Sequence, residues 1–144
     1  MFLLFSGKGY GQVNIIPKLY LPTQNTPSGN SGWTITSAAT NNAGTDYWKM
    51  LTGSSLVTPA MNFSSYSGIT ITMSLQSFGT IVSNSDKVKI EYFDGTTYSQ
   101  VGALLATTST KGNQTVSLPY TYNGAKIRIT TPNATAAAGA RVYS

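Results

Sequence analysis

Ile69-Thr70-Ile71-Thr72-Met73-Ser74-Leu75-Gln76 alternates apolar and polar residues without a break. In an extended chain successive side chains point to opposite sides, so this period of two turns one face toward a core and the other toward water. The stretch therefore predicts a β-strand in a sheet that is buried on one face.

Similar patterns recur on both sides of this stretch. Clear alternation predicts strands over 87–93, 115–118 and 126–130, and weaker patterns predict strands over 13–20, 33–36, 47–51, 55–58 and 141–143. Asp94-Gly95 is a tight-turn dipeptide, so 87–93 is expected to form a hairpin with a strand over 98–101. Residues 22–32 are dense in turn-forming residues and predict a loop. Eight or nine short strands at this spacing predict an all-β fold, an antiparallel two-sheet β-sandwich of the jelly-roll type.

The composition narrows the chemistry. The chain has 144 residues, the size of one ordinary domain, with 9% charged residues and no cysteine or histidine. Thiolate nucleophiles, imidazole acid–base catalysis and the usual zinc sites are therefore excluded. The net charge is +5, but the basic residues are scattered singly, which argues against a nucleic-acid partner. Lys87, Lys89 and Glu91 share one strand face, as do Lys126 and Arg128, and these charges are expected on the solvated side of a sheet.

The amino terminus is apolar and then small and polar. Residues 1–12 resemble the last part of a secretory signal peptide, which predicts a truncated signal remnant followed by a single β-sandwich domain over 13–144. The alternative is that this segment forms an edge strand or packs onto a neighbouring molecule. The signal-like segment predicts a location that is secreted or at the cell surface. No stretch reaches the about 20 apolar residues that a membrane-spanning helix needs.

Four carboxylates are the only candidates for acid chemistry. Asp94 is explained by its turn and Glu91 by its strand face, which leaves Asp46 and Asp86. A catalytic pair is not expected from them, and the chain is predicted not to be an enzyme. Asp46 or Asp86 with loop carbonyls could hold a structural calcium ion, since hard cations accept oxygen ligands.

Aromatic side chains are the candidate binding residues. Sugar rings present apolar faces that stack on Trp and Tyr, although an aromatic residue in a β-sandwich more often fills the core. Within Tyr47-Trp48 one ring is expected to point inward and the other outward, because neighbours alternate along a strand. The candidate ligand-binding residues are Trp33, Tyr47, Trp48, Tyr98, Tyr120 and Tyr122, with the last two as the best exposed pair.

Several segments together resemble a known family. They are Gly32-Trp33-Thr34, residues 41–50 and 55–66, the hairpin Tyr92-Phe93-Asp94-Gly95-Thr96-Thr97-Tyr98, and residues 116–118 with 122–129. This pattern is similar to galactose-binding-like jelly-roll modules of the adhesin-like, choice-of-anchor type found in secreted Bacteroidetes proteins. The family typically carries a calcium-binding acidic residue in its last strand, whereas residues 139–144 contain none.

The resemblance implies a noncatalytic accessory or adhesion module that contacts carbohydrate or another cell-surface component. Two alternatives stay open at this stage. The chain could be a structural subunit or spacer that self-associates when its amino-terminal segment adds a strand to a neighbour. It could also be an accessory domain of a larger secreted hydrolase. A shared fold does not choose among them, because function depends on the site.

Overall fold

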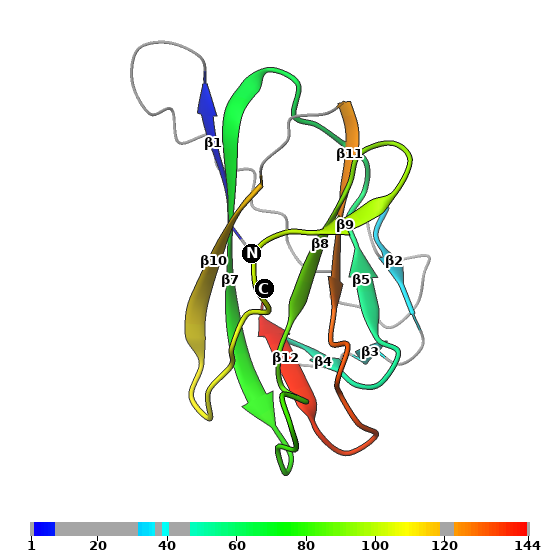
Figure 1. Cartoon of the computed structure of the whole chain (residues 1–144), viewed down its shortest axis with the longest axis vertical. Coiled ribbons are helices and arrows are strands. Elements are labelled where there is room, and N and C mark those ends of the chain that lie inside the picture. Colours follow the sequence, from blue (N-terminus) through cyan, green and yellow to red (C-terminus); the bar gives the residue numbers. More distant parts are fainter. Residues whose placement is uncertain (1, 8–31, 37–38, 41–46, 119–122, 144) are drawn as a thin grey trace.

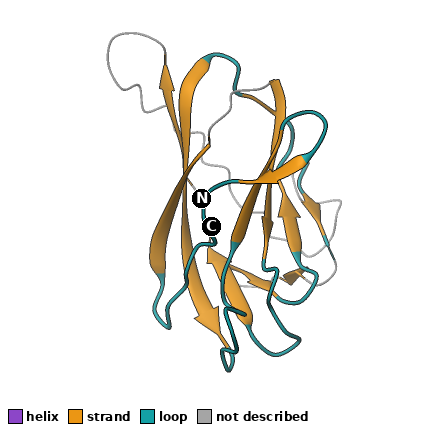
Figure 2. Cartoon of the chain, in the orientation of Figure 1, coloured by secondary structure: helices purple, strands orange, loops and turns teal. Residues whose placement is uncertain are grey.

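The computed structural model describes residues 2–7, 32–36, 39–40, 47–118 and 123–143. These residues form strands and loops, arranged as two antiparallel sheets that pack face to face (Figures 1 and 2). The predicted all-β, two-sheet sandwich of the jelly-roll type is confirmed. The strand predicted over 13–20 lies outside the described residues. Within the described segments, no helix has the length and apolar character to cross a membrane.

The first sheet, called sheet A, is built around the strand that alternates most regularly in the sequence. Its order is β1-β7-β12-β4-β3, with β10 also paired to β7. Its strands are β1 (Phe2–Gly7), β3 (Ala39–Thr40), β4 (Tyr47–Met50), β7 (Tyr66–Phe78), β10 (Gly112–Leu118) and β12 (Gly139–Tyr143).

Strand β7 has three partners, and two of them share one of its edges. β10 pairs with residues 69–75, β1 with residues 66–72 and β12 with residues 74–78. A strand residue can pair with one neighbour on each side, so β10, which overlaps both of the others, lies on the opposite edge from them. β1 and β12 therefore lie end to end along the same edge of β7.

Residues 2–7 thus form a strand, which was the alternative to a signal remnant. Their pairing with β7 runs from Phe2 opposite Thr72 to Gly7 opposite Tyr66. Cleavage of residues 1–12, and with it the domain limits 1–12 and 13–144, stays a prediction.

The second sheet, called sheet B, has the order β2-β5-β11-β8-β9, with β6 also paired to β11. β5 pairs with residues 128–130 of β11 and β8 with residues 126–130, so these three strands lie side by side. The strands of sheet B are β2 (Thr34–Ile35), β5 (Ser55–Val57), β6 (Met61–Asn62), β8 (Lys89–Phe93), β9 (Tyr98–Gln100) and β11 (Asn123–Thr130).

One hydrophobic core fills the space between the sheets. Sheet A contributes the apolar half of each alternating strand, and sheet B contributes residues such as Leu56 and Ile127, all almost fully buried. Burying one large apolar side chain is worth about 1.5–3 kcal/mol, so this cluster is the main source of stability. The outer faces of the two sheets consequently lie on opposite sides of the molecule.

The β8–β9 hairpin differs from its prediction by one position. The central turn residues are Gly95 and Thr96 rather than Asp94 and Gly95, because Asp94 N donates to the carbonyl of Thr97. Gly95 has a φ of 101°, which suits glycine, and Asp94 Oδ1 accepts hydrogen bonds from the backbone N of Thr97 and Thr96, each at 2.9 Å. These two bonds lower the pKa of Asp94 below its usual value.

Candidate functional site

The structure separates the predicted binding aromatics into three groups. Trp33 and Trp48 are 5% and 0% exposed and belong to the core, so the expectation that they bind a surface ligand is wrong. Trp48 points inward because it occupies the apolar half of the alternation in β4, whereas Trp33 directly precedes β2. Tyr120 and Tyr122 lie outside the described residues.

The two remaining predicted rings lie on different faces of the sandwich. Tyr47 points outward from sheet A while Trp48 points inward, as the alternation predicts. Tyr98 is half-buried on the outer face of sheet B, where it lies opposite Phe93 in the register of β8 and β9. The Phe93 and Tyr98 ring centroids are 4.9 Å apart, with the planes tilted by 38°. Among the residues that the structure describes, the fold therefore does not bring the predicted aromatics together into one platform.

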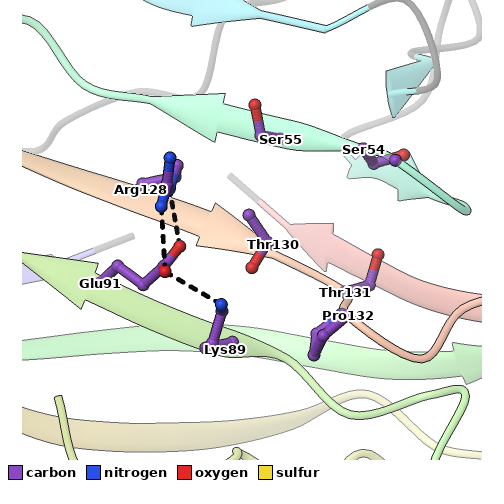
Figure 3. A pocket seen from close by; sticks show the side chains of 9 residues that line it. Ser54, Ser55, Lys89, Glu91, Arg128, Thr130, Thr131 and Pro132 are labelled. Carbon is purple, nitrogen blue, oxygen red and sulfur yellow. Dashed lines mark hydrogen bonds and ion pairs between the residues drawn. The ribbon is translucent and has the colours of Figure 1, made fainter. Parts of the chain in front are cut away.

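Three charged residues meet beside this aromatic pair. Glu91 on β8 lies opposite Arg128 on β11, and Lys89 is two residues away on the same face of β8. Glu91 Oε2 accepts from Arg128 Nε at 2.6 Å, and Glu91 Oε1 accepts from Arg128 Nη2 at 3.0 Å and contacts Lys89 Nζ at 2.9 Å (Figure 3). The result is a bidentate Arg–carboxylate pair with a second cation attached.

Glu91 lies on the outer face of sheet B, as expected, but its neighbours bury its side chain. Its side chain is 7% exposed, whereas those of Lys89 and Arg128 are 27% and 33% exposed. Burial raises the pKa of Glu91, but the hydrogen bonds and charges of Arg128 and Lys89 lower it by more, so the pKa lies below its usual value. Glu91 raises the pKa of Arg128 in turn. The formal charges of the three groups sum to +1.

Arg128 also connects the charged group to the aromatic pair. Its Cζ lies 4.0 Å from the centroid of the Tyr98 ring, within the range of a cation–π contact. Tyr98, Arg128 and Glu91 therefore form a continuous surface across β9, β11 and β8.

A cavity of about 290 Å³ opens beside the charged group (Figure 3). Its floor is one register row across three strands, in which Ser55, Thr130 and Lys89 lie side by side. The cavity is lined by Gly53, Ser54, Ser55, Lys89, Glu91, Arg128, Thr130, Thr131 and Pro132.

The turn before β5 shapes the rim of this cavity. Ser54 Oγ accepts from Leu51 N at 2.6 Å, and Gly53 adopts a φ of 74°. Thr131 Oγ1 donates to the carbonyl of Leu51 at 3.2 Å, which ties the end of β11 to the same turn. The rim is thus held by hydrogen bonds between segments that are distant in sequence.

The cavity offers hydrogen-bonding groups that the described residues leave unused. Thr130 Oγ1 is buried and has no hydrogen-bond partner in the described part of the chain. After their contacts with Glu91, Arg128 and Lys89 retain roughly five N–H donors between them. A ligand rich in hydroxyl groups would satisfy both the hydroxyl of Thr130 and these donors.

Of the two predicted calcium ligands, Asp46 lies outside the described residues. Asp86 Oδ2 accepts a hydrogen bond from Thr107 Oγ1 at 2.7 Å. Among the residues the structure describes, no three carboxylate, histidine or cysteine side chains are grouped so as to hold a metal ion. In this part of the chain, the carboxylate of Asp86 fixes a loop.

In comparisons with known proteins, the chain resembles a solved structure. No protein-family model matches the chain. No curated protein matches it either. A solved structure, the CBM22-1 xylan-binding domain from Paenibacillus barcinonensis Xyn10C, is similar at 16% sequence identity and a TM-score of 0.40, over 85% of this chain and 86% of that domain. What the site of this chain can bind follows from its own side chains.

Proposed function

We propose that this protein is a noncatalytic carbohydrate-binding module of an exported protein, and that the outer face of sheet B binds the sugar. The observation that supports it is a polar cavity with unused hydrogen-bonding groups, lined in part by Arg128, which also contacts the half-buried ring of Tyr98. At about 290 Å³ the cavity is at the small end of ligand pockets, which span roughly 300–1,000 Å³, and it suits a single sugar ring. The family resemblance of the sequence supports the same function.

The chemistry of Glu91 supports binding rather than hydrolysis. Glycoside hydrolysis uses two carboxyl groups, and the one that acts as general acid needs a raised pKa. Glu91 is the one carboxylate among the residues that line the cavity, and its pKa is lowered. It therefore acts as a fixed hydrogen-bond acceptor that orients Arg128 and Lys89.

Thr130→Val tests the site with little change in shape. It removes the unpartnered hydroxyl, and we expect the affinity for any neutral oligosaccharide found on a glycan array to fall about five- to tenfold, the effect of one lost hydrogen bond. Isothermal titration calorimetry of the two proteins measures the change.

Thr115→Val is the matched control. Thr115 is exposed on β10, on the outer face of the opposite sheet, so the same substitution there should leave sugar affinity unchanged. An array on which no neutral glycan binds at millimolar concentration, or an equal loss in both variants, would contradict the proposed function.

A second candidate function is assembly by strand addition. The pairing of Phe2–Gly7 with β7 supports it, because a strand that completes the edge of β7 within one chain can complete the same edge of a neighbouring chain. Exchange of this kind keeps every backbone hydrogen bond and costs little.

Size-exclusion chromatography over a range of concentrations tests strand addition. The full chain is expected to form dimers or larger species as concentration rises, and a version that begins at Trp33 is expected to remain monomeric. If both versions elute as monomers at every concentration, strand addition does not occur.

A further inference from the structure

Six side chains on the outer face of sheet A form a continuous row of cations and rings. In spatial order the cationic row consists of Lys111, Tyr143, Tyr47, Arg141, Phe78 and Lys49. The register explains it, since Tyr143 lies opposite Tyr47 and Arg141 lies opposite Lys49 across β12 and β4. The row crosses strands that are far apart in sequence, so no single segment reveals it.

The contacts along the row are close. Lys111 Nζ lies 4.1 Å from the centroid of the Tyr143 ring, and that ring is 5.3 Å from the ring of Tyr47. Arg141 Cζ lies 5.2 Å from the Tyr47 ring and 5.8 Å from the Phe78 ring. Lys49 Nζ lies 4.6 Å from the Phe78 ring. Three positive charges are thus held together by aromatic faces.

Lys49 and Arg141 have no carboxylate partner within the described part of the chain. Of the carboxylates described there, Glu91 is paired with Lys89 and Arg128 on the other sheet, Asp94 accepts from its own turn, and Asp86 accepts from Thr107. A cation–π contact does not neutralise a cation, so among the described residues the charges of Lys49 and Arg141 are not balanced by a carboxylate and attract anions.

Arg141 is the member best suited to grip an anion. Its Nη1 donates to Gln76 Oε1 at 3.1 Å, and its buried Nε has no hydrogen-bond partner among the described residues. A guanidinium that turns toward a carboxylate gives up one hydrogen bond and gains two in a bidentate pair. The unmet Nε makes that exchange favourable.

Hydroxyl-binding side chains flank the row. Ser74 lies opposite Tyr143 across β7 and β12, and its hydroxyl donates to Asn113 Oδ1 at 2.5 Å. Gln76 accepts from both Arg141 and the hydroxyl of Tyr143. The same face therefore presents charge for an anionic group, beside amide and hydroxyl groups that are hydrogen-bonded within the protein.

We propose that the outer face of sheet A binds an acidic polysaccharide, whose carboxylates pair with Arg141 and Lys49. Single-stranded nucleic acid is disfavoured, because bases need free aromatic faces to stack on. Phe78 and Tyr143 are only 9% and 8% exposed, and cations lie over both rings. This site lies on the opposite side of the molecule from the sheet B cavity and does not depend on the neutral sugar proposed there.

The test uses polygalacturonate as the acidic polymer and galactan as the neutral one. In affinity electrophoresis we expect polygalacturonate to retard the full chain at low salt, galactan to retard it less, and the retardation to weaken as salt rises. Lys49→Gln combined with Arg141→Gln should weaken binding about tenfold or more. If the double variant fails to fold, Lys49→Gln alone replaces it, with an expected loss of polygalacturonate affinity of about threefold.

Lys87→Gln combined with Lys126→Gln is the matched control. It removes the same charge from the segment that precedes β8 and from the outer face of sheet B, and should change polygalacturonate binding less than about twofold. The proposal is overturned if the full chain does not bind polygalacturonate, if the control loses as much affinity as the site variant, or if single-stranded DNA binds as tightly. Thr130→Val should leave polygalacturonate binding intact, which separates this proposal from the sheet B cavity.

Discussion

Replacing Gly139 with Ala is expected to lower the free energy of unfolding by about 3 kcal/mol, at the upper end of overpacking effects. A Cβ atom at this position would lie 2.1 Å from the carbonyl oxygen of Met50 and 3.3 Å from Cβ of Ala134. The first contact is with backbone, so it can be relieved only by pushing β12 away from β4. Urea unfolding followed by fluorescence measures the change.

Gly112→Ala is the control for this substitution. Gly112 begins β10 in the same sheet, and a Cβ atom there meets nothing within 4 Å. The expected change is within about 0.5 kcal/mol in either direction. If both glycine variants unfold at the same urea concentration as the original protein, the close approach of β12 to β4 is not as described.

Replacing Glu91 with Gln is expected to cost about 2 kcal/mol of unfolding free energy at pH 7. Removing one partner of a fully buried ion pair costs roughly 3–5 kcal/mol, and an exposed pair contributes at most about 1. Glu91 is buried and its two cations are about a third exposed, so the effect lies between these limits. Without the carboxylate, Lys89 and Arg128 repel each other across β8 and β11.

The pH dependence follows from the lowered pKa of Glu91. Because the folded-state pKa lies below the ordinary glutamate value of 4.5, the stabilisation is complete above that value and is lost as pH falls through the folded pKa. The difference in unfolding free energy between the Glu91→Gln protein and the original protein should therefore become smaller at acid pH. Combining it with Arg128→Gln should recover part of the loss at pH 7. A Glu91→Gln protein as stable as the original at pH 7 would contradict the pairing.

The sequence predicts the strands better than the sites, and the reason is the range of the interactions. Alternation is a local signal, so it places the stretch 69–76 correctly within β7 and puts Tyr47 and Trp48 on opposite faces, but it does not decide which ring points inward. Two-residue strands such as β3 and β6 are too short to show a period. The turn of the β8–β9 hairpin is displaced by one residue because the side chain of Asp94 caps the backbone rather than occupying the turn centre.

Both candidate sites depend on pairing between distant strands. Glu91 and Arg128 meet only because β8 and β11 are neighbours in a particular register, and Arg141 reaches Tyr47 only because β12 lies beside β4. A shift of one residue in either register would send these side chains to the other face. The register between these strands cannot be predicted from the spacing of residues in the sequence.

The position of β12 also bears on when the protein can fold during its synthesis. Gly139–Tyr143 is the last of the described strands to leave the ribosome, yet it lies between β7 and β4 in the interior of sheet A. A nascent chain that ends before Gly139 contains β7 and β4 but lacks the strand that pairs with both of them. Sheet A therefore closes after translation of its final strand, and the many pairings between distant segments make that closure slow.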